Sequence, residues 1–224
     1  MVVPLITTVP IADPDAIARV AAEVGQAPPP RWVALTSATA VRLVLGAAGA
    51  AALSGLLVAA VGPATAAALE AEGVAVDVVP SKHDADGLAE AMLQRGMSGA
   101  TVWLPIAEGA RGGFAESLRA GGASVAVQHI YRSVMPESAP QRLRAALAGG
   151  VDAITLTSGS TTRNLVQAMG RAGVPPEVVI VCIGEQTAGE ARASGLVVHA
   201  VAGDTSVEGL VSALTECVTP QRLR

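Results

Sequence analysis

Short apolar runs alternate with longer segments of helical spacing along most of the chain. Runs such as 32–36 and 57–61 show almost no polar alternation, which is typical of strands covered on both faces. The intervening segments 64–71 and 87–95 carry small and apolar residues at helical intervals. The pattern predicts an α/β protein with parallel sheets flanked by helices. The expected strands are 32–36, 57–61, 74–79, 101–104 and 125–130 in the middle of the chain, and 2–8, 153–156, 178–183 and 197–201 toward its ends.

The same unit occurs twice in the chain, 121 or 122 residues apart. The matching stretches are Leu35-Thr36-Ser37 with Arg42 and Leu156-Thr157-Ser158 with Arg163; Val61-Gly62 with Thr65-Ala66 and Ile183-Gly184 with Thr187-Ala188; Gly73-Val74-Ala75-Val76 and Gly195-Leu196-Val197-Val198; and Asp86-Gly87-Leu88 and Glu208-Gly209-Leu210. Because these landmarks keep their order and spacing, each half of the chain is expected to fold as a similar lobe.

The repeat also predicts the domain boundaries. Residues 10–134 are expected to form an inserted lobe with five strands, and residues 1–9 and 135–224 a discontinuous lobe with four. The discontinuous lobe shows no equivalent of the strand–helix unit at 101–121, so we expect that the usual opening unit is missing from its start. The chain then passes twice between the lobes.

Composition narrows the classes of partner. Aromatic residues are 2% of the chain, and its formal charge is −4 with a pI near 5.4, which argues against nucleic-acid binding. Lys82 is the only lysine, so arginine is almost the only side-chain cation. Cys182 and Cys217 have no metal-ligand spacing, and no metal site is expected.

The chain is expected to be a cytoplasmic protein with no membrane partner. Its first ten residues lack a basic leader and are interrupted by Pro4 and Pro10, unlike a signal peptide. The uncharged stretch 43–69 contains several glycines and Pro63, which favours helix, strand and helix over one membrane span.

Six motifs in order resemble the uroporphyrinogen-III synthase family over nearly the whole chain. They are Thr36-Ser37-Ala-Thr-Ala-Val41, Val61-Gly-Pro-Ala-Thr-Ala66, Leu104-Pro-x-x-Glu108-Gly-Ala-Arg111, Ile130-Tyr-Arg-Ser-Val134, Thr157-Ser-Gly-Ser160 and Ile183-Gly-x-x-Thr187-Ala188. The resemblance implies two α/β lobes joined by a two-stranded linker, with the active site in a cleft between them. It also implies the reaction: hydroxymethylbilane loses its terminal hydroxyl and closes to uroporphyrinogen III with the last pyrrole ring inverted. It implies a small-molecule substrate as the partner, no metal or organic cofactor, and a monomer.

The expected binding groups lie where strands end and helices begin. Free backbone N–H groups and the positive end of the helix dipole favour carboxylates there, although a Ser or Thr at such a place is equally typical of a simple helix cap. Carboxylate partners could also come from Arg42, Arg111 and Arg163, whereas His83, His129 and His199 are interpreted as solvated or strand-end residues. The predicted substrate-binding residues are Thr36, Ser37, Gly62, Thr65, Thr157, Ser158, Ser160, Gly184 and Thr187.

Tyr131, the only tyrosine, is the candidate catalytic acid. A phenol has an ordinary pKa of about 10, so it is protonated at neutral pH and can donate to a departing hydroxyl. The resemblance implies this role for the matching tyrosine, while packing of the linker is the structural alternative.

Three other functions are alternatives at this point. A non-catalytic relative that binds a tetrapyrrole or another polyanion for regulation is favoured by Ile106-Ala107, which replace a cation of the family pattern, and by the missing opening unit. Further departures are Ala38 and Gly159 after each Thr-Ser, and Glu185-Gln186 after Gly184. A binder of the periplasmic type fits less well, because no signal peptide is expected and both lobes are short. A dinucleotide enzyme fits least well, because no Gly-x-Gly-x-x-Gly follows a strand.

Overall fold

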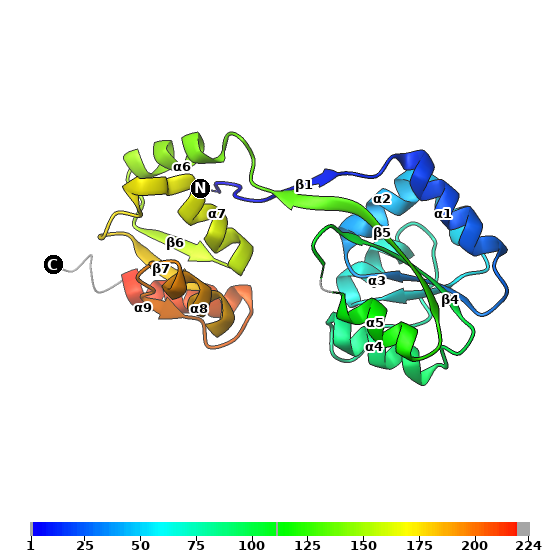
Figure 1. The fold of residues 1–224 in the computed structure, drawn as a ribbon. Coiled ribbons are helices and arrows are strands. Elements are labelled where there is room, and N and C mark those ends of the chain that lie inside the picture. The colour runs from blue at the N-terminus through cyan, green and yellow to red at the C-terminus, as the bar shows by residue number, and fades with distance from the viewer. Residues whose placement is uncertain (1, 111, 219–224) are drawn as a thin grey trace. The chain divides into compact units, whose positions relative to one another are not determined.

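The chain forms two compact α/β units. The computed structural model describes residues 2–110 and 112–218 (Figure 1). The middle unit is Thr8–Ser133, and the terminal unit takes the residues up to Thr7 and from Val134 onward. Strands and helices alternate in each unit, which confirms the predicted fold class.

The middle unit is built on a five-stranded sheet with the order β1-β5-β4-β2-β3. The pairs β2–β3, β2–β4 and β4–β5 are all parallel, as the unbroken apolar runs predicted. Its elements are β1 (Thr7–Pro10), α1 (Pro14–Gln26), β2 (Arg31–Leu35), α2 (Ala38–Ala48), η1 (Ala50–Leu53), β3 (Leu57–Ala60), α3 (Pro63–Glu70), α4 (Ala85–Gln94), β4 (Thr101–Ala107), α5 (Gly113–Ala120) and β5 (Ser124–Val134).

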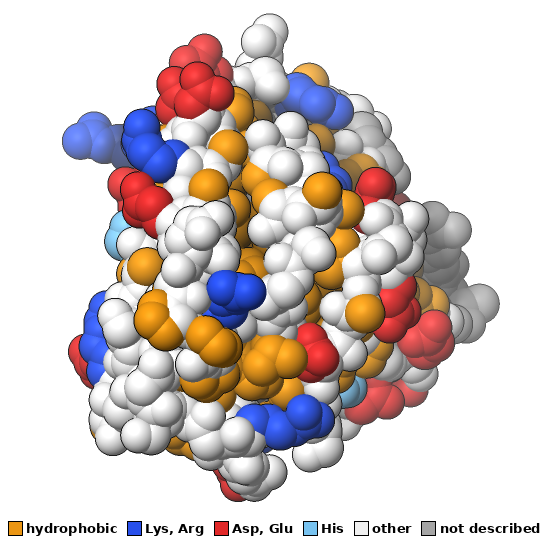
Figure 2. Space-filling view, turned by 90° about the vertical axis from the view of Figure 1, so that its right-hand side faces the viewer, with side chains coloured by type: hydrophobic (Ala, Val, Ile, Leu, Met, Phe, Trp, Pro, Cys, Tyr) orange, Lys and Arg blue, Asp and Glu red, His pale blue; other side chains and the backbone are white. Residues whose placement is uncertain are grey.

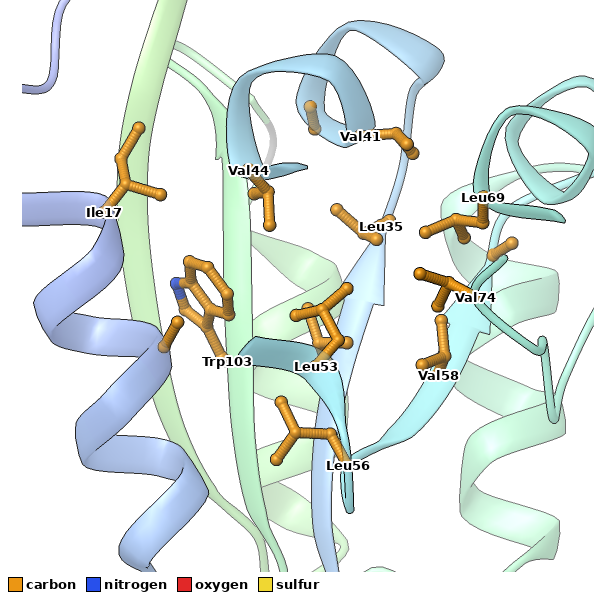
Figure 3. Close-up of a cluster of buried hydrophobic side chains, with 14 of the residues drawn as sticks. Ile17, Leu35, Val41, Val44, Leu53, Leu56, Val58, Leu69, Val74 and Trp103 are labelled. Atoms are coloured by element: carbon orange, nitrogen blue, oxygen red, sulfur yellow. The ribbon is translucent and has the colours of Figure 1, made fainter. Parts of the chain in front are cut away.

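Helices cover both faces of this sheet, and successive strand residues therefore belong to different cores. On β2, Val33 and Leu35 pack with α1, α2 and α3, whereas Trp32 and Ala34 pack with α4 and α5. Figure 3 shows the first of these cores, in which Trp103 of β4 lies among side chains of α1 and α2. The indole N–H of Trp103 donates to Gln128 Oε1 (3.0 Å), so this buried polar atom has a partner.

The terminal unit has a three-stranded parallel sheet with the order β6-β7-β8. On β7, Ile180 and Cys182 face the core formed with α6, α7 and α8, and Val179 and Val181 face α9. Its elements are α6 (Ala139–Ala148), β6 (Ala153–Leu156), α7 (Gly159–Met169), η2 (Gly170–Ala172), β7 (Val179–Cys182), α8 (Glu185–Ala193), β8 (Ala200–Val201) and α9 (Val207–Val218).

The internal repeat is also seen in the backbone conformation at the starts of individual helices. Helices α2 and α7 are both 11 residues long and begin after Ser37 and Ser158, which have nearly the same extended backbone angles. Helices α3 and α8 begin after Gly62 and Gly184, again in matching conformations. Equivalent residues of the two units can therefore be compared one by one.

Two predicted strands are wrong. Residues 74–79 form only a single parallel bridge, between Ala59 and Val78. The cause lies in Asp77, whose carboxylate accepts from the Val58 N–H (2.7 Å), a donor that a continuous ladder would bond to a backbone carbonyl. Among the described residues, β6 and β7 of the terminal sheet thus correspond to β2 and β3 of the middle sheet, and β8 corresponds to the bridge at Val78.

Residues 2–6 do not form the predicted fourth strand of the terminal unit either. Pro4 lacks an N–H, and Leu5 is instead buried in the terminal core, where its carbonyl accepts from Asn164 Nδ2 (2.7 Å). The strand begins at Thr7 and belongs to the middle sheet, beside β5. In the described residues β6 is therefore an edge strand, beside an apolar groove of about 340 Å³ lined by Val3, Leu147 and Ile154 among others.

The uncharged stretch 43–69 divides among α2, η1, β3 and α3, as its glycines predicted. Among the helices of the described residues, none is long and apolar enough to cross a membrane.

Candidate active site

Four loops that follow β2, β3, β6 and β7 open directly into helices. Because β2 is parallel to β3 and β6 is parallel to β7, the two loops of one unit lie at the same edge of its sheet, where the strands end. The predicted residues Thr36, Ser37 and Gly62 belong to the loops of the middle unit, and Thr157, Ser158 and Gly184 to those of the terminal unit. The predicted set is thus brought together within each unit.

Ser37 connects one of these loops to the candidate acid. Its Oγ accepts from the Ala40 N–H (3.0 Å) and caps α2, and it lies 2.9 Å from the hydroxyl of Tyr131. Tyr131 comes from β5 and is only 9% exposed. When Ser37 donates in this pair, the phenolic proton is free for a ligand, and the serine hydroxyl stabilises the oxygen that loses it.

A β-bulge aims Tyr131 at this position. Ile106 of β4 pairs with His129, but Ala107 pairs with Tyr131, so Ile130 is an extra residue in β5. Ile130 and Tyr131 belong to the same hydrophobic core, although neighbours in a regular strand point to opposite faces. The sequence shows the tyrosine but not the bulge that points it toward Ser37.

The starts of α3 and α8 differ from those of α2 and α7. Gly62 and Gly184 are the N-caps and have no side-chain hydrogen bond to the helix, so these starts present backbone N–H groups alone. Thr65 and Thr187 lie in the first turns, with 4% and 6% of their surface exposed. Their side chains are therefore packed inward.

Ser158 in the terminal unit has different partners from Ser37. Its Oγ accepts from the Thr161 N–H (3.2 Å) and lies 3.1 Å from Ser160 Oγ and 2.8 Å from Thr161 Oγ1. Thr157, which precedes it, is exposed. Ser158, Ser160 and Thr161 thus form a compact hydroxyl cluster, and its hydrogen bonds, unlike that of Ser37, involve no aromatic group.

Charged groups near these loops were largely missed by the sequence interpretation. His83 is exposed, in agreement with its interpretation as a solvated or strand-end residue, but it also packs against Gly62, since a Cβ there would lie 3.2 Å from the His83 Cβ. Next to it, Lys82 Nζ lies 2.9 Å from the Asp84 carboxylate, and this hydrogen bond raises the pKa of Lys82 and lowers that of Asp84. The contact of Thr205 with Gly184 at the equivalent place shows that the repeat could have identified this segment.

The two described arginines of the repeat are held differently. Arg42 donates to Thr39 Oγ1 (3.3 Å), whereas Arg163 forms a salt bridge with Glu190 of α8. Arg111 lies outside the described residues. His129 is exposed, and His199 Nδ1 accepts from the Ile180 N–H (3.0 Å), which gives it a structural role in the terminal sheet.

Other features lie away from these loops. A cavity of about 340 Å³, lined by Val174, Pro175 and Leu196 among others, lies by the beginning of β7 rather than its end. The described residues contain no cluster of three or more His, Cys, Asp or Glu side chains arranged to hold a metal ion. Figure 2 shows one face of the protein, on which acidic and basic side chains are interspersed among apolar ones.

Fold and loops define a class: α/β proteins with a duplicated unit, whose parallel strands end at helix-opening loops. The profile of the family described as Uroporphyrinogen-III synthase HemD matches residues 1–212, so the chain belongs to that family. The family resemblance seen in the sequence is thereby confirmed.

Individual relatives are distant. The chain is 38% identical over 117 residues to a putative uroporphyrinogen-III synthase of Methanothermobacter thermautotrophicus, and the alignment covers 51% of this chain and 46% of that protein. The chain thus matches about half the length of that relative. The solved uroporphyrinogen-III synthetase of Helicobacter pylori has a TM-score of 0.65 at 15% identity, covering 98% of this chain and 91% of that one. A mutant uroporphyrinogen III synthase of Thermus thermophilus has a TM-score of 0.61 at 18% identity, covering 100% and 90%. These two structures share the fold.

Proposed function

We propose that this protein is a uroporphyrinogen-III synthase, which converts hydroxymethylbilane to uroporphyrinogen III with loss of water. Membership of the family supports the assignment, and the pairing of Tyr131 with Ser37 at the end of β2 is the observation that carries it. Because most of its surface is buried, the phenol can transfer its proton to a ligand at the loop rather than to bulk water.

In the proposed reaction Tyr131 is the general acid. Its proton goes to the terminal hydroxyl of the substrate, the C–O bond breaks, and water leaves. Ser37 donates to the tyrosinate oxygen and stabilises its charge. The substrate cation closes the ring, with inversion of the last pyrrole, through a spiro intermediate. The ring carbon that forms the new bond then releases a proton, which restores the phenol.

Substrate binding is proposed for the loops at the strand ends. Each opens a helix, and the free N–H groups and the helix dipole at such a place favour the carboxylate side chains of the substrate unless a carboxylate of the protein already lies there. The proposed binding residues are those predicted from the sequence: Thr36, Ser37, Gly62, Thr65, Thr157, Ser158, Ser160, Gly184 and Thr187. Thr65 and Thr187, being buried, would act by holding the first turns of α3 and α8 in place.

The test is an assay of the product isomer. The purified chain is mixed with hydroxymethylbilane, and the oxidised products are separated as type I and type III porphyrins. Formation of type III at a rate proportional to protein concentration supports the proposal. Type I alone, at the spontaneous rate, would reject the proposal and favour the non-catalytic alternative. The buried, uncharged Ile106 of β4, which stands where the family pattern has a cation, would fit that alternative.

A further inference from the structure

In the terminal unit, an internal carboxylate occupies the start of α7. Arg163 of α7 donates through Nη1 to Glu190 Oε1 of α8, and the two side chains are 62% and 32% exposed. The same carboxylate lies against Gly159, where an added Cβ would collide with Glu190 Oε2. Glu190 therefore covers the first residue of the helix and neutralises the arginine one turn further on.

The middle unit lacks this arrangement. By the repeat, Gly159 corresponds to Ala38, Glu190 to Ala68, and Arg163 to Arg42. A methyl group takes the place of the glycine hydrogen, and a methyl group also stands where Glu190 has its carboxylate. Among the described residues Arg42 is in no salt bridge, and its guanidinium donates to Thr39 Oγ1. The two units thus differ at both positions of this contact.

A second segment shows the same difference in charge between the two units. Lys82, beside the Gly62 loop, corresponds to Asp204, whose pKa is lowered by its hydrogen bond to the Ser206 hydroxyl. Asp84, the N-cap of α4, corresponds to Ser206. The four positions Arg42, Ala68, Lys82 and Asp84 carry a net charge of +1, and their equivalents Arg163, Glu190, Asp204 and Ser206 carry −1.

We propose that Glu190 is a specificity-determining residue that prevents Arg163 and the start of α7 from binding a substrate carboxylate, so that this loop contacts the substrate through its hydroxyl groups alone. Arg42, at the equivalent loop of the middle unit, binds such a carboxylate instead. A second anion at the start of α7 would meet the charge of Glu190 in place, and it would have to displace that group from Arg163. This inference rests on the proposed function, because it concerns the carboxylates of the proposed substrate.

The test measures binding of mellitate, a benzene hexacarboxylate, by titration calorimetry at low salt. Glu190→Gln keeps the shape of the side chain and removes its charge, so it should bind mellitate about tenfold more tightly than the parent. Arg163→Gln should leave the affinity of the parent nearly unchanged, but abolish the gain when combined with Glu190→Gln. Arg42→Gln should weaken binding by the parent about tenfold.

Glu177→Gln is the matched control. Glu177 is an exposed residue of the same unit in the loop before β7, and its replacement removes the same charge away from α7. An equal gain with Glu177→Gln would mean a general charge effect and would overturn the inference. Unchanged or weaker binding by Glu190→Gln, a loss with Arg163→Gln as large as with Arg42→Gln, or binding by neither the parent nor Glu190→Gln would overturn it as well. Because mellitate binding needs no turnover, these outcomes are separate from failure of the isomer assay, which concerns the proposed function alone.

Discussion

The hydroxyl of Tyr131 lies 2.9 Å from Oγ of Ser37, although the two residues are 94 positions apart in the chain. The serine caps α2 through the Ala40 N–H, and the tyrosine is placed by a bulge of β5. One hydroxyl therefore links the start of a helix to a buried phenol. The consequences for activity and for stability can be tested separately.

Tyr131→Phe should lower kcat for type III product about a hundredfold or more, because it removes the proton donor and keeps the ring. Single-turnover assays with separation of the porphyrin isomers would measure this, and type I product should accumulate instead. Ser37→Ala should also slow the reaction, but it should have little further effect in the Tyr131→Phe protein, since the serine acts through the phenol. Equal type III rates for the parent and Tyr131→Phe would show that another group supplies the proton.

Ser37→Ala and Ser158→Ala should each destabilise their unit by about 1 kcal/mol, since each serine caps an 11-residue helix in the same geometry. The Ser37 variant should lose more, because the hydroxyl of the buried Tyr131 also loses its hydrogen bond to Ser37. Hydrogen exchange in α2 and α7 measures the two effects independently. A smaller loss in α2 than in α7 would contradict the expected contribution of the tyrosine.

Gly159→Ala should destabilise the terminal unit, because the new methyl group collides with the carboxylate of Glu190. The side chain of Glu190 is partly exposed and can move, so we expect a cost of about 1 kcal/mol. Thermal unfolding of the single and double variants would measure it. Adding Glu190→Ala should recover the loss, because the double variant has the alanine pair found at 38 and 68 in the middle unit. A loss that persists in the double variant would place the strain in the backbone rather than in this contact.

Cys217 should react with iodoacetamide faster than Cys182 in the native protein. Cys182 is fully buried on β7, and burial raises the pKa of its thiol, whereas Cys217 is partly exposed on α9. Because the thiolate is the reactive form, a raised pKa leaves less of it at any pH below that value, and the alkylation of Cys182 should rise only at higher pH. Mass spectrometry of peptides after timed alkylation from pH 7 to 9.5 measures both rates. Faster labelling of Cys182 would contradict its burial.

Most of the architecture could be predicted from the sequence, because the information is local or repeated. Unbroken apolar runs predict strands covered on both faces, and β2, β3 and β7 lie within about one residue of the expected positions. The repeat predicts that Ser37 and Ser158, like Gly62 and Gly184, open equivalent helices, and the structure shows matching backbone angles at each pair. Helix starts depend on a few neighbouring residues, which the sequence lists directly.

Strand pairing was harder to predict, because it depends on which groups meet across the sheet. Residues 74–79 have the composition of a strand, but the Asp77 carboxylate takes the donor at Val58 and only one bridge forms. Residues 2–8 are equally apolar, yet Leu5 packs in the terminal core while Thr7 starts a strand of the middle sheet. In both cases a contact distant in sequence outweighs local propensity.

For the candidate site, the sequence by itself determined the residue types: the single tyrosine, the paired serines and glycines, and the arginine in each repeat. Only the tertiary structure decided their relationships. A bulge of β5 places the hydroxyl of Tyr131 within hydrogen-bond distance of Ser37, and the packing of α7 and α8 places the Glu190 carboxylate over Gly159 and against Arg163. These contacts connect residues 94, 31 and 27 positions apart, and their geometry depends on how whole strands and helices pack, which no local pattern of residues encodes.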